Sequence, residues 1–236
     1  MPTGWEDRAS EWLAWARTPG HDAYWRYRDA FHALVPPPAG RALEVGCGEG
    51  RVTRDLTARG HAVTALDASP TLVAAAAERD PAGVYLVADA CDLPFGDASF
   101  DLVVAYNVLM DVQDMPRAVS EAARMLRGAG HLCACVTHPA TDAGAWRAGQ
   151  EGEGEDYLAG GRFAFDDERD GLRIRWEGHR YSLEHYSRAL EQAGLLIEAI
   201  RETPARPGRR PLRAVGARAD VPPDPRSARR LNSSLR

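Results

Sequence analysis

Between residues 41 and 217 the chain alternates short apolar runs with longer amphipathic stretches. Apolar runs without polar alternation are typical of strands buried on both faces of a parallel sheet, and amphipathic stretches at helical spacing predict the helices that cover it. We therefore expect an α/β fold with a seven-stranded, mostly parallel sheet and helices on both faces. The predicted strands are 42–45, 61–67, 84–88, 100–106, 131–137, 195–201 and 212–217, and the predicted helices are 51–59, 70–79, 116–126 and 183–193.

Two segments depart from this alternation. Residues 5–34 carry aromatic side chains at helical spacing and are divided by Pro19-Gly20, which predicts two helices that form an N-terminal cap. After the fifth strand, residues 149–154 predict a flexible loop, and Asp170-Gly171 predicts a hairpin that serves as a lid on the ligand side of the sheet. The expected units are a helical cap at 1–38, an α/β domain at 39–218 with a lid insertion at 140–180, and a mobile basic tail at 219–236.

Composition narrows the class of protein. A chain of 236 residues with 44% hydrophobic residues is long enough for one well-cored domain with modest additions. No apolar run approaches the ~20 residues that a membrane span needs, and the first residues lack the basic and apolar regions of a signal peptide. The four cysteines form no C-x-x-C pair, so we expect reduced thiols, no metal site and a cytoplasmic protein.

The basic residues are unevenly distributed. The net charge is −5, yet residues 201–236 contain ten Arg and only three acidic residues. A basic tail can bind nucleic acid, but this one is Pro-rich, contains no aromatic residue and is typical of a mobile segment. We therefore expect a small-molecule partner and neither a nucleic-acid nor a membrane partner. Both a monomer and a homodimer stay open.

A glycine-rich turn follows the first predicted strand. Residues 42–51 read Ala-Leu-Glu-Val-Gly-Cys-Gly-Glu-Gly-Arg, so Gly46, Gly48 and Gly50 stand at alternate positions before a helix. Glycines leave the backbone bare for a ligand, and the first N–H groups of a helix are unpaired. This pattern predicts a loop that binds a nucleotide-type cofactor. A dinucleotide loop, G-x-G-x-x-G, would need glycine where Arg51 stands.

Acidic residues follow the next strands. Asp67 ends the second predicted strand about 20 residues after the loop, where a carboxylate can accept hydrogen bonds from both ribose hydroxyls. Asp89 and Asp111 come after the third and fourth predicted strands. Because ligands of parallel sheets bind beyond the carboxyl ends of the strands, we expect these residues to surround the same site.

Three further segments point to one family. Residues 89–95 (Asp-Ala-Cys-Asp-Leu-Pro-Phe), 100–105 (Phe-Asp-Leu-Val-Val-Ala) and 124–130 (Arg-Met-Leu-Arg-Gly-Ala-Gly) are similar to its motifs. With the glycine loop, the chain resembles the class I S-adenosylmethionine (SAM)-dependent methyltransferase family over roughly residues 41–200. The resemblance is nearest to the branch that methylates low-molecular-weight metabolites. It implies a Rossmann-like fold, SAM as the cofactor, and methyl transfer to oxygen, nitrogen or carbon in secondary metabolism.

The resemblance also implies which residues bind the cofactor. The glycines let the aminoacyl end of SAM approach the backbone, and Glu44 orders the loop by accepting backbone N–H bonds. Asp67 binds the ribose hydroxyls, and Ala68 meets the adenine face. Asp89 and Ala90 meet the adenine edge. The expected cofactor-binding residues are Tyr24, Arg28, Glu44, Gly46, Cys47, Gly48, Gly50, Asp67, Ala68, Ser69, Asp89, Ala90, Cys91 and Tyr106.

On the acceptor side, methyl transfer needs a nucleophile held in line with the methyl group and shielded from water, and it needs no metal. His138 follows the fifth strand and is expected to face the pocket, as a general base, a substrate-orienting partner or a structural residue. The expected substrate contacts are Trp25, Asn107, Asp111, His179 and Tyr181.

Other functions stay open at this point. The chain could methylate RNA or protein, or it could bind SAM without transferring a methyl group. An NAD(P)-dependent oxidoreductase would need glycine at position 51 and a Tyr/Lys or equivalent pair for hydride chemistry, and the chain contains no Lys.

Overall fold

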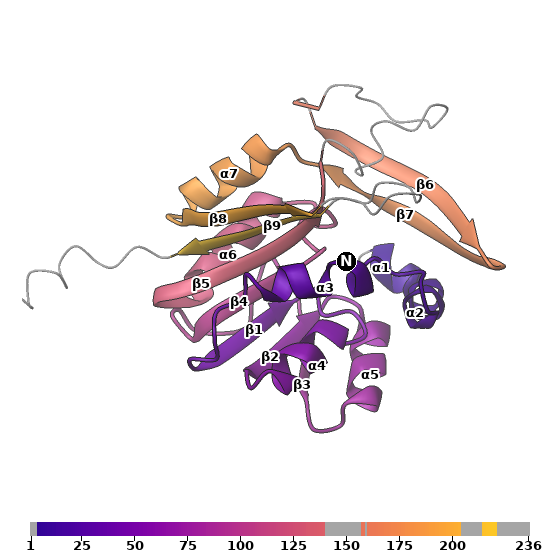
Figure 1. Cartoon of the computed structure of the whole chain (residues 1–236), viewed down its shortest axis with the longest axis horizontal. Coiled ribbons are helices and arrows are strands. Elements are labelled where there is room, and N and C mark those ends of the chain that lie inside the picture. The colour runs from indigo at the N-terminus through magenta and orange to yellow at the C-terminus, as the bar shows by residue number, and fades with distance from the viewer. Residues whose placement is uncertain (1–3, 140–156, 159, 204–213, 221–236) are drawn as a thin grey trace, which may run out of the picture.

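A single mixed sheet forms the centre of the molecule (Figure 1). The computed structural model describes residues 4–139, 157–158, 160–203 and 214–220. The strand order is β3-β2-β1-β4-β5-β9-β8. The strands are β1 (Arg41–Val45), β2 (Ala62–Asp67), β3 (Val84–Val87), β4 (Phe100–Tyr106), β5 (Leu126–Thr137), β8 (Leu196–Thr203) and β9 (Ala214–Asp220).

The strand directions confirm the predicted Rossmann-like α/β fold. Strands β1 to β5 pair in parallel, whereas β9 pairs antiparallel with both β5 and β8. The sheet is therefore a five-stranded parallel sheet that is extended to seven strands at one edge. The carboxyl ends of β1, β2 and β4 meet at one side of this sheet, where the predicted ligand residues lie.

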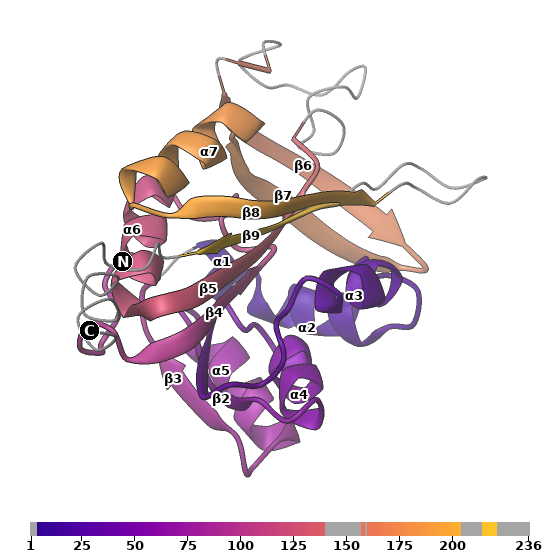
Figure 2. The ribbon, with the colours of Figure 1, turned by 60° about the vertical axis from the view of Figure 1, so that its left-hand side comes forward.

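Helices cover both faces of the sheet, as predicted (Figure 2). On one face, α6 (Met115–Met125) and α7 (Leu183–Gln192) contribute Val119 and Leu190 to the larger core cluster. On the other face, α3 (Tyr24–His32) and α4 (Arg51–Ala58) contribute Phe31 and Leu56 to the second cluster. A further helix, α5 (Pro70–Arg79), follows β2. The apolar strands are thus buried from both sides, which is why their sequences do not alternate.

Capping side chains set the helix starts. Ser69 accepts a 3.2 Å hydrogen bond from the N–H of Leu72, and Ser182 caps α7 in the same way, so both predicted caps are confirmed. Asp114 accepts from the N–H of Arg117 at 3.0 Å, a cap that starts α6 at Met115, one residue before the predicted start.

Strand β5 begins five residues earlier than predicted. The added residues include the Gly-Ala-Gly sequence at 128–130, where Ala129 adopts a left-handed backbone with φ 64° within the strand. The pairing of β4 with β5 shifts register between Phe100 and Leu102, so the strand passes through a bulge.

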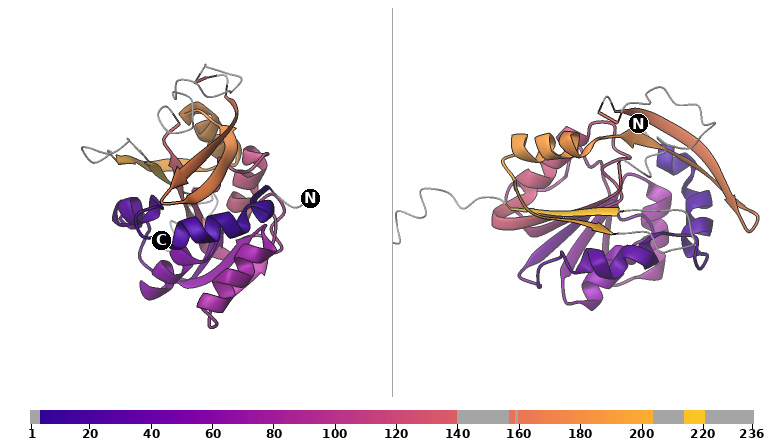
Figure 3. Two further views of the ribbon diagram at one scale, coloured as in Figure 1. Left: turned by 90° about the vertical axis from the view of Figure 1, so that its right-hand side faces the viewer. Right: turned by 45° about the horizontal axis from the view of Figure 1, so that its top comes forward.

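The N-terminal region forms three helices instead of the two predicted. Residues Gly4–Asp7 form α1 and Ala9–Arg17 form α2, and the expected break near Pro19-Gly20 separates α2 from α3. Glu6 of α1 accepts hydrogen bonds from the Ser69 hydroxyl and, at 2.7 Å, from the Thr71 hydroxyl, both at the start of α5. These bonds fasten the N-terminal helices across the carboxyl side of the sheet (Figure 3).

The predicted hairpin is confirmed and is longer than expected. Strands β6 (Gly161–Arg169) and β7 (Leu172–Arg180) form their own two-stranded sheet. Asp170 and Gly171 have φ values of 51° and 78°, the left-handed pair that a tight two-residue hairpin turn requires. The hairpin lies against α2 (Figure 1). The predicted loop at 149–154 and most of the tail predicted at 219–236 lie outside the described residues.

None of the helices that the structure describes combines the length and apolarity needed to span a lipid bilayer.

Glu121 of α6 links this helix to the segment that follows β3. The residue is 3% exposed, and its carboxylate accepts from the N–H of Leu93 at 2.9 Å and from Arg124 at 2.9 and 2.6 Å. Arg124 in turn donates to the carbonyls of Leu93 and Phe95 at 3.0 and 2.8 Å. The hydrogen bonds from Arg124 hold the pKa of Glu121 below its ordinary value.

We predict that Glu121→Gln lowers the free energy of unfolding at pH 7 by about 1–3 kcal/mol, because the variant loses charge-assisted hydrogen bonds. Since the folded-state pKa of Glu121 is depressed, its contribution is present above the unfolded pKa of about 4.3 and is lost as the pH falls through the folded value. Urea unfolding at several pH values should show the gap to the wild type narrowing below about pH 4.3.

The exposed pair of Glu184 and Arg188 on α7 supplies the control. We expect Glu184→Gln to change stability by at most about 0.5 kcal/mol. An equal loss in the two variants would contradict the role given to Glu121.

Candidate functional site

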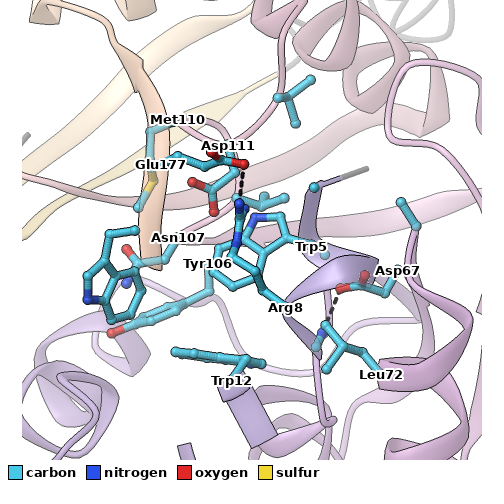
Figure 4. Close-up of a pocket in the computed structure, with 18 of the residues that line it drawn as sticks. Trp5, Arg8, Trp12, Asp67, Leu72, Tyr106, Asn107, Met110, Asp111 and Glu177 are labelled. Carbon is cyan, nitrogen blue, oxygen red and sulfur yellow. Dashed lines mark hydrogen bonds and ion pairs between the residues drawn. The ribbon is translucent and has the colours of Figure 1, made fainter. Parts of the chain in front are cut away.

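A cavity of about 940 Å³ lies at the carboxyl ends of β1, β2 and β4. Its walls come from the glycine-rich turn, the strand ends, α1, α2 and the β6–β7 hairpin (Figure 4). Proteins enclose single small ligands in pockets of about 300–1,000 Å³, so this cavity has room for a cofactor and part of a second molecule.

The glycine turn forms the floor of the cavity. Gly46 and Gly48 have φ values of 71° and 53°, and both line the cavity together with Cys47. A Cβ added to Gly46 would lie 2.4 Å from Cγ2 of Val108, so no side chain fits between β1 and the residues that follow β4. Gly50 does not line the cavity; it has φ 80° and stands at the start of α4.

Asp67 joins this turn to the end of β2. One carboxylate oxygen accepts from the N–H of Gly48 at 2.8 Å, and the other accepts from the N–H of Ser69 at 2.9 Å. Burial raises the pKa of Asp67. Each oxygen keeps a further lone pair, so the carboxylate can still accept hydrogen bonds from a ligand in the cavity.

The end of β3 supplies a second carboxylate. Asp89 lines the cavity and accepts from the N–H of Cys91 at 2.8 Å. Ala68, Ala90 and Cys91 line the cavity as well. Sequence reasoning therefore placed the carboxylates of two consecutive strand ends around one cavity, as the structure has them. The Ser69 side chain, which was expected to bind the cofactor, caps α5 instead.

Glu44 is 1% exposed and lines the bottom of the cavity. It accepts a hydrogen bond from the Thr53 hydroxyl of α4, a side-chain donor where backbone N–H groups had been expected. Burial raises its pKa to about 8. The carboxyl group thus holds α4 against β1 beneath the glycine turn.

The residues predicted on α3 do not reach the cavity. The Tyr24 hydroxyl and the Arg28 guanidinium both bind Asp55 of α4, with Arg28 Nη2 at 2.7 Å from Asp55 Oδ1. Trp25 is 56% exposed. The sequence places Tyr24 and Arg28 on one helix, but their side chains point toward Asp55 because they bind its carboxylate.

His138 also lies apart from the residues that line the cavity. Its Nε2 is 2.5 Å from Oε1 of Glu202 on β8. Side chains alternate between the two faces of a strand, and Thr137, one residue earlier, is the residue that lines the cavity. The expected orientation of His138 toward the pocket is therefore wrong, and its proposed part in the chemistry has no support from this geometry.

Of the two predicted substrate residues at the end of the hairpin, His179 lines the cavity and Tyr181 does not. His179 lines the cavity, donates its backbone N–H to the carbonyl of Met110 at 2.7 Å, and has its pKa lowered by burial. The Tyr181 hydroxyl donates to the carbonyls of Val112 and Gln113 at 3.2 and 3.1 Å and does not line the cavity. Tyr181 therefore supports the loop after β4 instead of contacting a ligand.

Four tryptophans wall the cavity on the side opposite the sheet. Trp5, Trp12 and Trp15 come from α1 and α2, and Trp176 comes from β7. The ring centroid of Trp176 lies 6.4, 5.8 and 6.0 Å from those of the other three, each pair in an edge-to-face arrangement. Sequence analysis overlooked this cluster. The spacing of Trp12 and Trp15 placed them on one helix face, but nothing local showed that the hairpin would bring Trp176 to them.

Arginines lie over three of these rings. Arg8 is 5.0 Å from the ring centroid of Trp5, Arg51 is 4.8 Å from that of Trp12, and Arg169 is 5.0 Å from that of Trp15. Each has a carboxylate partner, which is Glu177, Asp22 and Asp167 respectively. These three arginines are thus paired within the protein.

The end of β4 brings Asn107 and Asp111 into the cavity. Asn107 has φ 54° and donates its backbone N–H to the carbonyl of Cys135 at 2.8 Å. A left-handed backbone at a non-glycine residue is often found at functional sites. Burial raises the pKa of Asp111 to about 8, although Arg8 and a hydrogen bond from Trp5 act in the opposite direction.

Within the described parts of the chain, no group of three or more His, Cys, Asp and Glu side chains is placed to hold a metal ion.

Comparison with known proteins extends these observations. Residues 43–134 match the model of a methyltransferase domain. The chain is 38% identical over 112 residues to a probable S-adenosylmethionine-dependent methyltransferase of Mycobacterium tuberculosis, a match that covers 46% of this chain and 41% of the relative. It is 35% identical over 132 residues to the 27-O-demethylrifamycin SV methyltransferase of Amycolatopsis mediterranei, covering 48% of each. The match thus spans about half the length of these relatives.

Solved structures share the fold. An S-adenosylmethionine-dependent methyltransferase from Mesorhizobium loti has a TM-score of 0.64 at 22% identity and covers 84% of this chain and 98% of its own. The [4+2]-cyclase SpnF has a TM-score of 0.62 at 21% identity, and the match covers 88% of this chain and 85% of the cyclase. At these identities the likeness establishes the fold alone.

We predict that Gly178→Ala disturbs the contact between the hairpin and the loop after β4. A Cβ there would lie 2.9 Å from the carbonyl oxygen of Met110 and 3.1 Å from Oδ1 of Asp111, so the backbone must shift. Overpacking of this kind costs about 1–3 kcal/mol. Thermal unfolding should show the loss, and near-ultraviolet circular dichroism should show a changed tryptophan environment.

Gly128→Ala is the matched control, because nothing lies within 4 Å of a Cβ at that position. We expect it to stay within about 0.5 kcal/mol of the wild type. A Gly178→Ala variant with wild-type stability and an unchanged tryptophan spectrum would show that the hairpin does not pack tightly there.

Proposed function

Because the chain belongs to the class I SAM-dependent methyltransferase family, we propose that it transfers the methyl group of SAM to an oxygen, nitrogen or carbon atom of a small metabolite. The observation that carries this proposal is one cavity that contains both the glycine turn with its strand-end carboxylates and an aromatic compartment beside them. The first part suits a nucleoside cofactor, and the second suits a small acceptor.

The residues of the first part fit the cofactor that this family uses. The backbone of Gly46 and Gly48 is bare on the cavity side, and a Cβ on Gly48 would meet only Nε1 of Trp12, at 3.4 Å. We place the aminoacyl end of SAM over this turn. Asp67 would accept from the ribose hydroxyls with its remaining lone pairs, and Asp89 with Ala90 would meet the adenine edge.

Other predicted cofactor residues support the site from outside. Tyr24 and Arg28 hold α4 through Asp55, Ser69 caps α5, and Gly50 starts α4. Their effect on the cofactor is therefore indirect. They fix the two helices whose first turns stand next to the glycine turn and Asp67.

When bound, SAM supplies a methyl group on a positively charged sulfur. The protein has to hold the nucleophile in line with that methyl group and keep water away. The tryptophans of α1, α2 and β7 supply an apolar wall for this purpose. Asn107, Asp111 and His179 are the predicted substrate residues that line the cavity, and we propose that they orient the acceptor.

Relatives of this chain are named for different acceptors, namely demethylmenaquinone, 27-O-demethylrifamycin SV and malonyl-[acyl-carrier protein]. We propose a low-molecular-weight acceptor from secondary metabolism for this chain. Release of the demethylated cofactor in the presence of small-molecule extracts, purified RNA or purified protein would test the choice. Turnover with RNA or protein alone would overturn it, and SAM binding without turnover on any acceptor would leave only the binding function.

We predict that Asp67→Ala weakens the binding of SAM about 10- to 100-fold, because the ribose loses charge-assisted hydrogen bonds and the turn loses its contact with Gly48. Isothermal titration calorimetry with SAM gives the dissociation constant directly.

Asp29→Ala on α3 serves as the control, since Asp29 is exposed and does not line the cavity. It should bind SAM as the wild type does. Equal affinity of wild type and Asp67→Ala would remove the ribose assignment.

A further inference from the structure

The wall formed by the end of β4 contains buried polar atoms that lack good partners. Oδ1 of Asn107 has no hydrogen-bond partner among the residues that the structure describes. Tyr106 is 8% exposed. In the part of the chain that the structure describes, the thiol of Cys135, a weak hydrogen-bonding group, is the nearest approach to a partner for its hydroxyl. Both residues line the cavity. A buried acceptor without a donor is costly, so this wall suits a ligand that donates hydrogen bonds.

The charge of Asp111 lies on the same wall. In Figure 4, Tyr106, Asn107, Asp111 and Glu177 are drawn on one side of Arg8 and Asp67 on the other. Arg8, the cation that acts on Asp111, forms an ion pair with Glu177. The positive charge of Arg8 is therefore already balanced.

The groups around Asp111 leave this region negative. Asp67 and Glu177 both act to raise the pKa of Asp111, as burial does, whereas Arg8 and the Trp5 indole act to lower it. Among the charged groups that act most strongly on Asp111, two are carboxylates and one is an arginine. A ligand that carries a positive charge would relieve this imbalance, and a ligand that carries a negative charge would add to it.

The tryptophans that line the cavity beside Asp111 suit the rest of such a ligand. Trp5, Trp12 and Trp176 give an apolar and aromatic surface. Tryptophan rings bind both cations and apolar groups. The arginines over Trp5 and Trp12 show that these rings accept cations.

Resting on the proposed function, we propose that the acceptor is a small molecule with a basic amine on an apolar or aromatic body. Its ammonium group is held at Asp111, with the Asn107 oxygen and the Tyr106 hydroxyl beside it. Its body lies against the tryptophan wall. Asp111 is then the residue that determines specificity for a cationic substrate.

Three probes with a common phenyl body test this assignment: 2-phenylethylamine, 2-phenylethanol and phenylacetate. Their binding to the full chain is measured at about pH 9, where Asp111 with its pKa of about 8 is ionised and an alkylammonium with a pKa of about 10 is still charged. Tryptophan fluorescence reports the binding, and S-adenosylhomocysteine is present so that no methyl transfer occurs. We expect the amine to bind at least ~10-fold more tightly than the alcohol, and phenylacetate to bind least tightly. Equal binding of amine and alcohol, or tightest binding of phenylacetate, would overturn the proposal.

Asp111→Asn tests the residue itself, because the amide keeps the size of the carboxylate and removes its charge. The preference for the amine should fall to within ~2-fold, with the affinity for S-adenosylhomocysteine unchanged. Asp166→Asn, an exposed change on the same hairpin that walls the cavity, should keep the full preference, since Asp166 does not line it. An Asp111→Asn variant that keeps the preference contradicts the role of Asp111.

Titration of S-adenosylhomocysteine alone separates this proposal from the proposed function. If the wild type does not bind it, the methyltransferase function fails. If the wild type binds it and still shows no preference for the amine, the amine proposal fails while the methyltransferase function stands. Should Asp111→Asn not fold, the three probes on the wild type decide the question.

Discussion

The contact between Asp67 and the N–H of Gly48 determines the shape of the site. It joins the end of β2 to a turn whose glycines at 46 and 48 take left-handed backbone angles, and the Cβ of any other residue at 46 would collide with Val108. The turn can therefore keep its backbone open to a ligand only because neighbouring strands hold it from two sides. Replacing the contact by water would leave a flexible glycine segment without a defined shape.

The remaining walls come from segments far apart in the chain. Glu6 fastens α1 to the start of α5, and Arg8 of the same region pairs with Glu177 on β7. Trp176 then completes the tryptophan cluster with side chains from α1 and α2. Because these contacts join the N-terminal helices, the sheet and the hairpin, the aromatic compartment exists only in the folded chain.

Sequence reasoning succeeded where a local rule sets the structure. The glycine turn, the Ser69 and Ser182 caps, the Asp170-Gly171 turn and the carboxylates at the strand ends all follow from backbone conformation or strand order. It failed where a distant partner decides the direction of a side chain. Tyr24 and Arg28 turn to Asp55, His138 turns to Glu202, and Trp176 meets the N-terminal helices. The partners in each of these contacts are at least 27 residues apart in the sequence, so no short sequence pattern predicts the contact.

The buried carboxyl groups of the cavity link ligand binding to the stability of the fold. Burial raises the pKa values of Glu44, Asp67 and Asp111, which means that their ionised forms are less stable in the folded chain than in water. A protein selected only for stability would not gather such groups. Glu44 also lines the cavity, but it accepts a hydrogen bond from Thr53 within the protein. A ligand that donates hydrogen bonds to Asp67 and Asp111, or that carries positive charge, stabilises these two ionised carboxylates and the fold together. Binding and stability are therefore linked through the same two side chains.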